Sequence, residues 1–211
     1  MHIPDGLLNS AVIGTTGTLT VLGTAKTIQK TKALLDDSSI PTAGIMAAFI
    51  FAAQMLQFPA GPGVSGHLLG GALSAILFGP WIGSFIMSIV LIIQCIVFQD
   101  GGLLALGANI LNMAFIGVFS AYFIYEIGHK LKVSLRIFAA SFFSVLLTAS
   151  FAGLELGLSG VFSSFSAGFF TIFIIHIPIA AIESVITLVV VSFISSNCPE
   201  YFKLLRRQPS C

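Results

Sequence analysis

Residues 81–98 read WIGSFIMSIVLIIQCIVF, an apolar stretch without a single charged residue. A run of about 18 such residues is typical of a helix inside a lipid bilayer and is rare in a soluble domain. The whole chain has the same character, because 56% of its 211 residues are apolar and only 8% are charged, where a soluble domain carries roughly 25% charged residues. The composition predicts an all-α integral membrane protein. It excludes a soluble enzyme, a nucleic-acid-binding protein and a disordered scaffold.

Apolar runs bounded by Gly, Pro and charged residues predict seven helical segments. They lie near Leu7–Ile28, Pro41–Gln57, Gly66–Phe78, Trp81–Phe98, Leu103–Ile127, Leu135–Leu156 and Phe165–Ile194. The third segment would extend only about 20 Å at 1.5 Å per residue, whereas the hydrocarbon core is about 30 Å thick. It is therefore also compatible with a re-entrant segment that does not cross.

The distribution of positive charge favours seven crossings over six. With seven crossings and the N-terminus outside, all nine basic residues fall on the cytoplasmic side, as the positive-inside rule prefers. If the third segment turned back, Lys130, Lys132 and Arg136 would lie outside instead. The nine residues are Lys26, Lys30, Lys32, Lys130, Lys132, Arg136, Lys203, Arg206 and Arg207. We therefore expect seven transmembrane helices, with the N-terminus outside and the C-terminus in the cytoplasm.

The N-terminus differs from a secretory signal, because residues 1–6 read MHIPDG and contain Asp5 but no Lys or Arg. The large side chain of His2 should also prevent removal of the initiator methionine, so we expect Met1 to keep a free amine. In the expected topology, the outer segments contain no Lys or Arg but do contain His2 and, at the end of the first loop, His67. Two of the four histidines thus share one side of the membrane.

A free N-terminus followed directly by histidine is a compact nitrogen chelator. The amine of Met1, the backbone nitrogen of His2 and the imidazole of His2 can close two small rings around one cation, and His67 is the obvious fourth ligand. Planar nitrogen ligation selects Ni(II) or Cu(II), with Co(II) also possible. For either histidine alone the simpler interpretation is structural, with His67 at the start of a helix and His2 an exposed terminal residue. The pair favours the metal site.

Other polar residues within the helices have two interpretations each. His176 and Glu183 lie seven positions apart on one helix face, so they form either a proton or cation relay or a buried hydrogen-bonded pair. Glu155, near the outer end of the sixth helix, is expected at the interface. Gln99 and Asn109 either bond between helices or orient the metal-binding segment.

Small residues in the first helix, Gly14, Gly17, Thr18, Thr20 and Gly23, predict a close approach of another helix, within the bundle or from a partner. No Walker A sequence occurs in the chain, so we do not expect it to hydrolyse ATP or to be an enzyme. Two other classes remain as alternatives. One is a stand-alone cation channel or proton-coupled carrier that uses His176, Glu183 and Glu155. The other is an intramembrane hydrolase that uses Ser65.

Five stretches resemble the CbiM/NikM family, the substrate-binding membrane subunits of energy-coupling factor (ECF) transporters for nickel and cobalt. They are MHIPDG (1–6), GHLLGGAL (66–73), QDGGL (99–103), LGANILNMA (106–114) and HIPIA (176–180). The resemblance extends from the first residue to about Ser184, and the N-terminal stretch is highly specific. It implies a seven-helix bundle in the cell membrane that holds the metal through the Met1 amine, two nitrogens of His2 and His67.

The resemblance also implies partners and a substrate. The partners are a coupling membrane subunit, two ATP-binding subunits and often a small accessory membrane protein. The substrate is Ni²⁺ or Co²⁺, with no prosthetic group. The loop before His67 is similar to that of nickel-binding members, so we expect nickel; cobalt uptake for cobalamin biosynthesis is the alternative. In this interpretation the chain is a single membrane domain, with a metal-binding segment at 1–6, a helix bundle at 7–196 and a cytoplasmic tail at 197–211.

Overall fold

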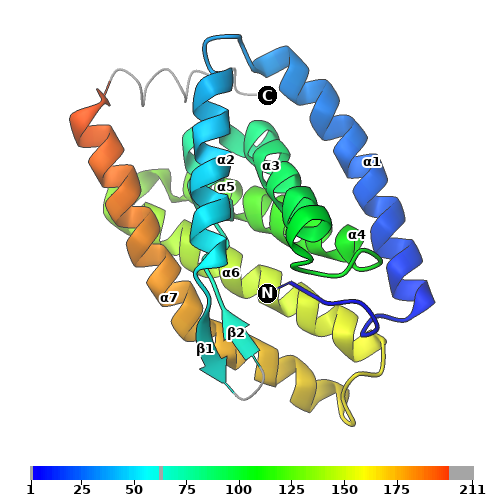
Figure 1. Ribbon diagram of the computed structural model, residues 1–211. Helices are drawn as coiled ribbons and strands as arrows, with labels where there is room; N and C mark the ends of the chain where they lie inside the picture. Colours follow the sequence, from blue (N-terminus) through cyan, green and yellow to red (C-terminus); the bar gives the residue numbers. More distant parts are fainter. Residues whose placement is uncertain (1, 62–63, 200–211) are drawn as a thin grey trace.

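The computed structural model describes residues 2–61 and 64–199, without the side chains of 58–61, 64, 65 and 167. Almost all of this part of the chain is helical, which confirms the helical class. The helices are α1 (Ser10–Leu34), α2 (Ile40–Met55), α3 (Gly71–Phe98), α4 (Leu106–Asn109), the π-helical η1 (Ile110–Gly117), α5 (Val118–Ile127), the short 3₁₀ turn η2 (Gly128–Lys130), α6 (Val133–Leu158) and α7 (Phe165–Asn197). Figure 1 shows their arrangement.

Helix α3 consists of two pieces joined at Gly79 and Pro80. Gly79 has φ 75° and ψ 176°, outside the helical region, and Pro80 follows it directly. In an unbroken helix, residues nine positions apart would be about 13 Å apart along the axis. Here a methyl group on Gly83 would instead lie 3.1 Å from the backbone carbonyl of Ser74. The chain therefore reverses at Gly79, between the third and fourth predicted segments.

The two β-strands of the described residues lie in the loop before α3. The predicted helix from Gly66 begins only at Gly71, because Phe58–Gly61 (β1) and Val64–Gly66 (β2) form an antiparallel hairpin. Prolines and glycines in this loop disfavour helix, and residues 67–70 follow it without regular secondary structure. Gly70 then caps α3 with φ 80°, a conformation that glycine adopts without strain.

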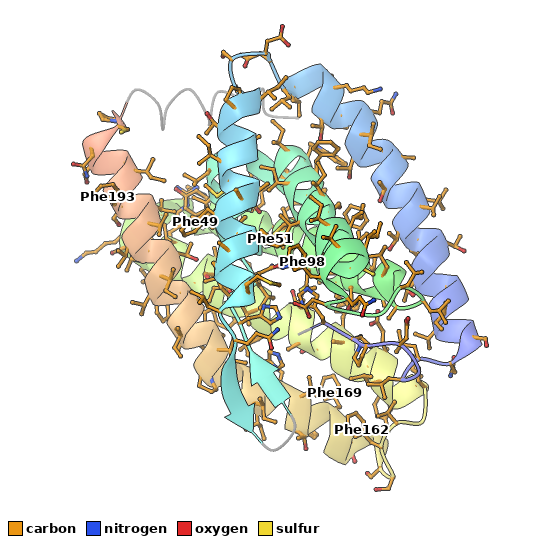
Figure 2. The ribbon with its side chains drawn as sticks, viewed as in Figure 1. Phe49, Phe51, Phe98, Phe162, Phe169 and Phe193 are labelled. Atoms are coloured by element: carbon orange, nitrogen blue, oxygen red, sulfur yellow. The ribbon has the colours of Figure 1, made fainter. Side chains whose placement is uncertain are left out.

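Four helical stretches in the described residues have the length and apolar composition of a membrane span: 71–98, which contains the reversal at Gly79, 106–130, 133–158 and 168–197. Helix α2 is apolar but has only 16 residues. The outer surface carries many large apolar side chains, including Phe193 at 66% exposure and Phe49 at 42%. By contrast, Phe51 packs against Phe98 between α2 and α3 with ring centroids 5.0 Å apart (Figure 2). Such an apolar exterior is what a multi-pass membrane protein presents to lipid.

Helix α1 packs on the bundle through small and hydroxylated residues. Thr20 donates a hydrogen bond of 2.6 Å to the carbonyl of Gly107. A methyl group on Gly107 would lie 2.7 Å from the Cα of Gly17, and one on Gly23 would meet the ring of Phe115 at 2.7 Å. This part of the small-residue pattern thus serves packing within the chain. Gly14 and Thr18 lie on the exposed face of the same helix.

The segment before α1 folds back over one end of the bundle, beside α4 and α6 (Figure 1). Its apolar residues belong to a small core cluster of their own, which joins the N-terminal segment to α4 and α6. The cluster contains Ile3, Leu8, Ala105, Ala108, Ala152 and Leu156. Because of this packing, the second residue of the chain lies inside the molecule.

Candidate metal centre

The backbone of Ile3 is held by Asn109 at the start of the π-helical segment. The N–H of Ile3 donates to Oδ1 of Asn109 at 2.8 Å, and the amide of Asn109 donates back to the carbonyl of Ile3 at 3.1 Å. The N–H of Gly102 donates to the same carbonyl at 3.0 Å. Asn109, one of the residues that the sequence suggested as an orienting partner, therefore fixes the position next to His2.

Asp5 anchors the N-terminal segment at a second point, on the backbone before α4. Its carboxylate accepts hydrogen bonds from the backbone N–H groups of Leu103, Leu104 and Ala105 at 2.9, 2.8 and 3.2 Å. These N–H groups precede α4, where an acidic group is favoured by the helix dipole. In the sequence, Asp5 indicated only a departure from signal peptides. The sequence PDG, which places an acid beside a turn, was the available signal.

The rings of His2 and His67 stack, with centroids 4.8 Å apart and an interplanar angle of 15°. His67 is 2% exposed and the side chain of His2 is 6% exposed. The two histidines that the sequence placed on one side thus lie against each other in the interior. This juxtaposition joins the first residues of the chain to the segment between β2 and α3.

The surroundings of His67 favour its neutral form. Burial lowers the pKa of the imidazole well below its usual value. Nδ1 lies 2.9 Å from the carbonyl of Leu68; since a carbonyl only accepts, the proton belongs on Nδ1. In that tautomer Nε2 carries the lone pair, which is the form that ligates a metal, and the bond to the carbonyl orients the ring.

Asp100 lies next to His2, although the sequence pointed to its neighbour Gln99. The distance from Oδ1 of Asp100 to Nδ1 of His2 is 3.3 Å. The contact with His2 lowers the pKa of the Asp100 carboxyl, so this group is ionised at neutral pH. Gln99 itself is exposed and ends α3 with φ 55°. The left-handed turn at Gln99 directs the following residue towards the histidines.

Gln54 in α2 and Glu183 in α7 form hydrogen bonds with the backbone of the segment that follows His67. Glu183 accepts hydrogen bonds from the N–H groups of Leu69 at 2.7 Å and Gly70 at 3.0 Å. Gln54 donates to the carbonyl of Leu69 at 2.6 Å. Glu183 is 1% exposed, so these backbone groups at the start of α3, rather than water, are the polar partners that its burial requires.

The suggested relay through His176 and Glu183 is not connected in the described residues. Nδ1 of His176 lies 2.7 Å from the carbonyl of Ile172 on its own helix, while Glu183 bonds the loop. Glu155 lies near the end of α6 and points into the bundle: it is 5% exposed and accepts a 2.7 Å hydrogen bond from the amide of Asn112. The π-helical η1 contains Asn112, and that bond provides the polar partner which burial of Glu155 requires.

Within the described residues no group of three or more His, Cys, Asp and Glu side chains is arranged to hold a metal ion. The ligand set expected from the sequence is of another kind, because it combines two imidazoles with an amine and a backbone nitrogen. Two residues of that set, His2 and His67, lie within the described residues, and their rings are in contact. Met1, like residues 200–211 of the expected tail, lies outside the described residues. The side chain of Ser65 also lies outside the description.

Comparison with known proteins gives consistent similarities. Residues 2–201 match the family CbiM, described as "cobalt uptake substrate-specific transmembrane region". A putative fused nickel transport protein NikMN of Archaeoglobus fulgidus is 40% identical over 204 residues, which cover 95% of this chain and 67% of that protein. A putative metal transport protein of Haloquadratum walsbyi is 37% identical, with 95% and 92% covered. The crystal structure of a transition metal transporter superposes with a TM-score of 0.87 at 29% identity, covering 98% and 99% of the two chains.

Proposed function

Because this chain belongs to the CbiM family, and is thus a membrane subunit of nickel or cobalt transport, we propose that it captures Ni²⁺ or Co²⁺ outside the cell for an ATP-driven importer. The observation that carries the proposal is the stacking of His2 on His67 inside the bundle. It places a histidine from the second position of the chain against one from a distant loop, which a purely structural role for either residue does not explain.

The proposed ligands are the amine of Met1, the backbone nitrogen and imidazole of His2, and the imidazole of His67. Chelate geometry requires Nδ1 of His2, because Nδ1 closes a six-membered ring with the backbone nitrogen whereas Nε2 lies too far along the ring. The bonds of Ile3 to Asn109 hold this end of the chain in place. Neutral His67 in its Nδ1–H tautomer supports the fourth bond, since the imidazole must offer a lone pair.

The proposed topology has seven crossings, with the metal site outside. Near one end of the bundle the end of α1 contacts the reversal in α3, where Thr31 bonds the carbonyl of Trp81 at 3.3 Å and Lys26 lies over its ring. The N-terminal segment lies at the opposite end, where Asn9 bonds Leu158. Helix α4 begins beside that segment, and η1 and α5 lead the chain away from it to Lys130. The described basic residues of α1 and of the α5–α6 turn therefore share one end, and the positive-inside rule makes it cytoplasmic.

Transport would then depend on partner subunits. We propose a coupling membrane subunit, two ATP-binding subunits and a small accessory membrane protein, with ATP hydrolysis in the partners. The Archaeoglobus protein is named as a fusion, and this chain covers 67% of its length. Such a fusion supports a transporter in which the membrane subunit works together with other subunits.

Nickel is the proposed substrate, with cobalt as the second candidate. Four nitrogen donors in a plane suit low-spin Ni(II) better than Co(II). The names of similar proteins include both metals, since the family description says cobalt and the Archaeoglobus relative is called a nickel transport protein. Donor chemistry therefore carries this choice.

The test is a titration of purified protein, with its native N-terminus, by Ni(II) and Co(II), followed by visible absorption. One Ni(II) per chain with a square-planar d–d band is expected. Tighter binding of Co(II) than of Ni(II) would keep the site and change the substrate. Absence of binding by folded protein with a free Met1 amine would overturn the proposal, and cation flux through the reconstituted chain alone would then be measured as evidence for a stand-alone carrier.

A further inference from the structure

Asp100 lies beside the proposed metal site but is not one of its four nitrogen ligands. Its Oδ1 is 3.3 Å from Nδ1 of His2. Its second oxygen, Oδ2, is buried, and among the described residues it has no hydrogen-bond partner. A buried carboxylate oxygen without a partner costs free energy, so it calls for a functional explanation.

The backbone around Asp100 is built to hold it there. Its N–H donates to the carbonyl of Gln94 at 3.1 Å, which closes the end of α3. Gln99 before it and Gly101 after it have φ values of 55° and 90°. A methyl group on Gly101 would lie 3.4 Å from Cβ of His2, so the turn packs directly on the histidine. The carboxylate is thus positioned by the turn rather than left to move in solvent.

We propose that Asp100 is an axial oxygen ligand of the transported metal ion and that it adapts the site to Co²⁺ as well as Ni²⁺. This inference rests on the proposed four-nitrogen site. Two donors at right angles, each about 2.1 Å from one ion, are about 3.0 Å apart. The observed 3.3 Å between Oδ1 of Asp100 and Nδ1 of His2 is close to that edge. The carboxylate therefore lies where a small movement completes a fifth bond.

Charge supports the same assignment. A divalent ion bound by one deprotonated backbone nitrogen and three neutral nitrogens keeps one positive charge. His2 and His67 are almost fully buried, and an uncompensated charge there would be costly. The carboxylate of Asp100 neutralises it. Its Oδ1 is already in ion-pair contact with Nδ1 of His2 at 3.3 Å.

The two metals should respond differently to an axial oxygen. Square-planar low-spin Ni(II) gains little from a fifth donor, whereas Co(II) readily takes five ligands including a carboxylate oxygen. Asp100 is therefore expected to contribute more to Co(II) binding than to Ni(II) binding. It is a residue that determines specificity, and the planar nitrogens supply the affinity common to both metals.

The test compares wild-type protein with Asp100→Asn, and uses Asp37→Asn as the control. Asp37 is an exposed acid in the loop between α1 and α2, so its substitution changes net charge equally without touching the site. Dissociation constants for Ni(II) and Co(II) are measured by competition with a chromogenic chelator. We expect Asp100→Asn to weaken Co(II) about thirtyfold and Ni(II) about threefold or less, with a weaker visible Co(II) spectrum of altered shape. Asp37→Asn should match wild type.

The outcomes distinguish a failure of the proposed metal-binding function from a failure of the axial ligand alone. If wild-type protein binds neither metal, the proposed function fails and this inference with it. If wild type binds both and Asp100→Asn binds them unchanged, or weakened equally, only the axial ligand is overturned. Should Asp100→Asn not fold, EPR of Co(II)-loaded wild type in H₂¹⁷O decides. Five donors without ¹⁷O broadening support a carboxylate oxygen, and a bound water or four donors overturns the assignment.

Discussion

The carboxylate of Glu183 in α7 lies 2.7 Å from the backbone nitrogen of Leu69, two positions beyond His67. Its other oxygen accepts from Gly70 at 3.0 Å. One buried side chain of a lipid-facing helix thus anchors the segment that presents the proposed fourth ligand.

Replacing Glu183 by Ala should weaken Ni(II) binding about 10–100-fold, the usual effect of removing a residue that orients a metal ligand. The two hydrogen bonds are also expected to contribute about 2 kcal/mol to stability. Glu183→Gln keeps one acceptor oxygen and should lie between Ala and wild type. Chelator competition gives the affinity, and thermal unfolding in detergent gives the stability.

The matched control is Glu155→Gln, because Glu155 is another buried carboxylate but bonds Asn112 rather than the His67 segment. It should lower thermal stability and leave Ni(II) affinity within about threefold. Equal losses of affinity in the Glu155 and Glu183 variants would show that general destabilisation, not orientation of His67, is responsible.

Asn109→Ala should loosen the N-terminal segment. It leaves the N–H of Ile3 without its partner, while the carbonyl keeps its bond from Gly102. A lost partner of this kind costs about 1–3 kcal/mol, and 1.4 kcal/mol is a factor of ten in affinity. We expect Ni(II) affinity to fall at least about tenfold, as measured by calorimetry.

Asn9→Ala is the control for that variant. Asn9 caps α1, since its Oδ1 accepts from the N–H of Val12 at 2.9 Å. The substitution also removes the bond from Asn9 to the carbonyl of Leu158, so it should cost about 2 kcal/mol of stability while the bonds of Ile3 stay intact. An affinity loss as large as that of Asn109→Ala would contradict a specific role for the bonds to Ile3.

Much of this arrangement could be predicted from apolar runs and helix-breaking residues. The reversal in α3 follows from Gly79-Pro80 between two apolar stretches, and both flanking helices were expected there. The hairpin of β1 and β2 was not predicted, because a loop rich in Pro and Gly is compatible with many backbone paths. The π-helical turns of η1 also lack a local signal, since their sequence is as apolar as any helix in the chain.

The two histidines of the candidate site could be predicted because each stands in an unusual local sequence. A histidine at the second position and one after a Gly/Pro-rich loop indicated the pair that the structure stacks. The partners of that pair depend on tertiary packing. Asp100, in the turn after α3, contacts His2, and Glu183 of α7 bonds the backbone of Leu69. No spacing in the sequence predicts either contact.

Gly102→Ala should disturb the site without altering any polar side chain. A methyl group there would collide with the backbone nitrogen and carboxylate of Asp5, so the N-terminal segment has to move. Ni(II) affinity should fall at least about tenfold, because displacement of this segment carries His2 with it. Gly44→Ala is the control: nothing lies within 4 Å of the added methyl, and alanine favours helix by up to about 1 kcal/mol. Its affinity should equal that of wild type.

The protonation of His67 should be unusual in metal-free protein. Burial keeps its pKa well below the usual value, so its ring should stay neutral as the pH falls through about 6.5, where an ordinary histidine becomes charged. Below about pH 6.5 the unfolded chain takes up a proton that the folded chain does not, so the free energy of unfolding should decrease as the pH falls. NMR of ¹⁵N-histidine-labelled protein follows this directly, and a His67 signal that titrates near pH 6.5 would contradict it.

Retention of the formyl group on Met1 tests the proposed chelate most directly. Protein expressed with an inhibitor of peptide deformylase keeps every residue of the chain, but its Met1 nitrogen is an amide without the lone pair of a free amine. The chelate ring between the Met1 nitrogen and the backbone nitrogen of His2 can then no longer close on the metal, so Ni(II) binding should fall by at least about a hundredfold. Titration followed by visible absorption measures the loss, and the planar d–d band should disappear with it. The matched control is the same protein after treatment with deformylase, which should restore Ni(II) binding. Unaltered Ni(II) affinity in the formylated protein would rule out the Met1 amine as a ligand, leaving the stacked imidazoles to bind metal in some other geometry.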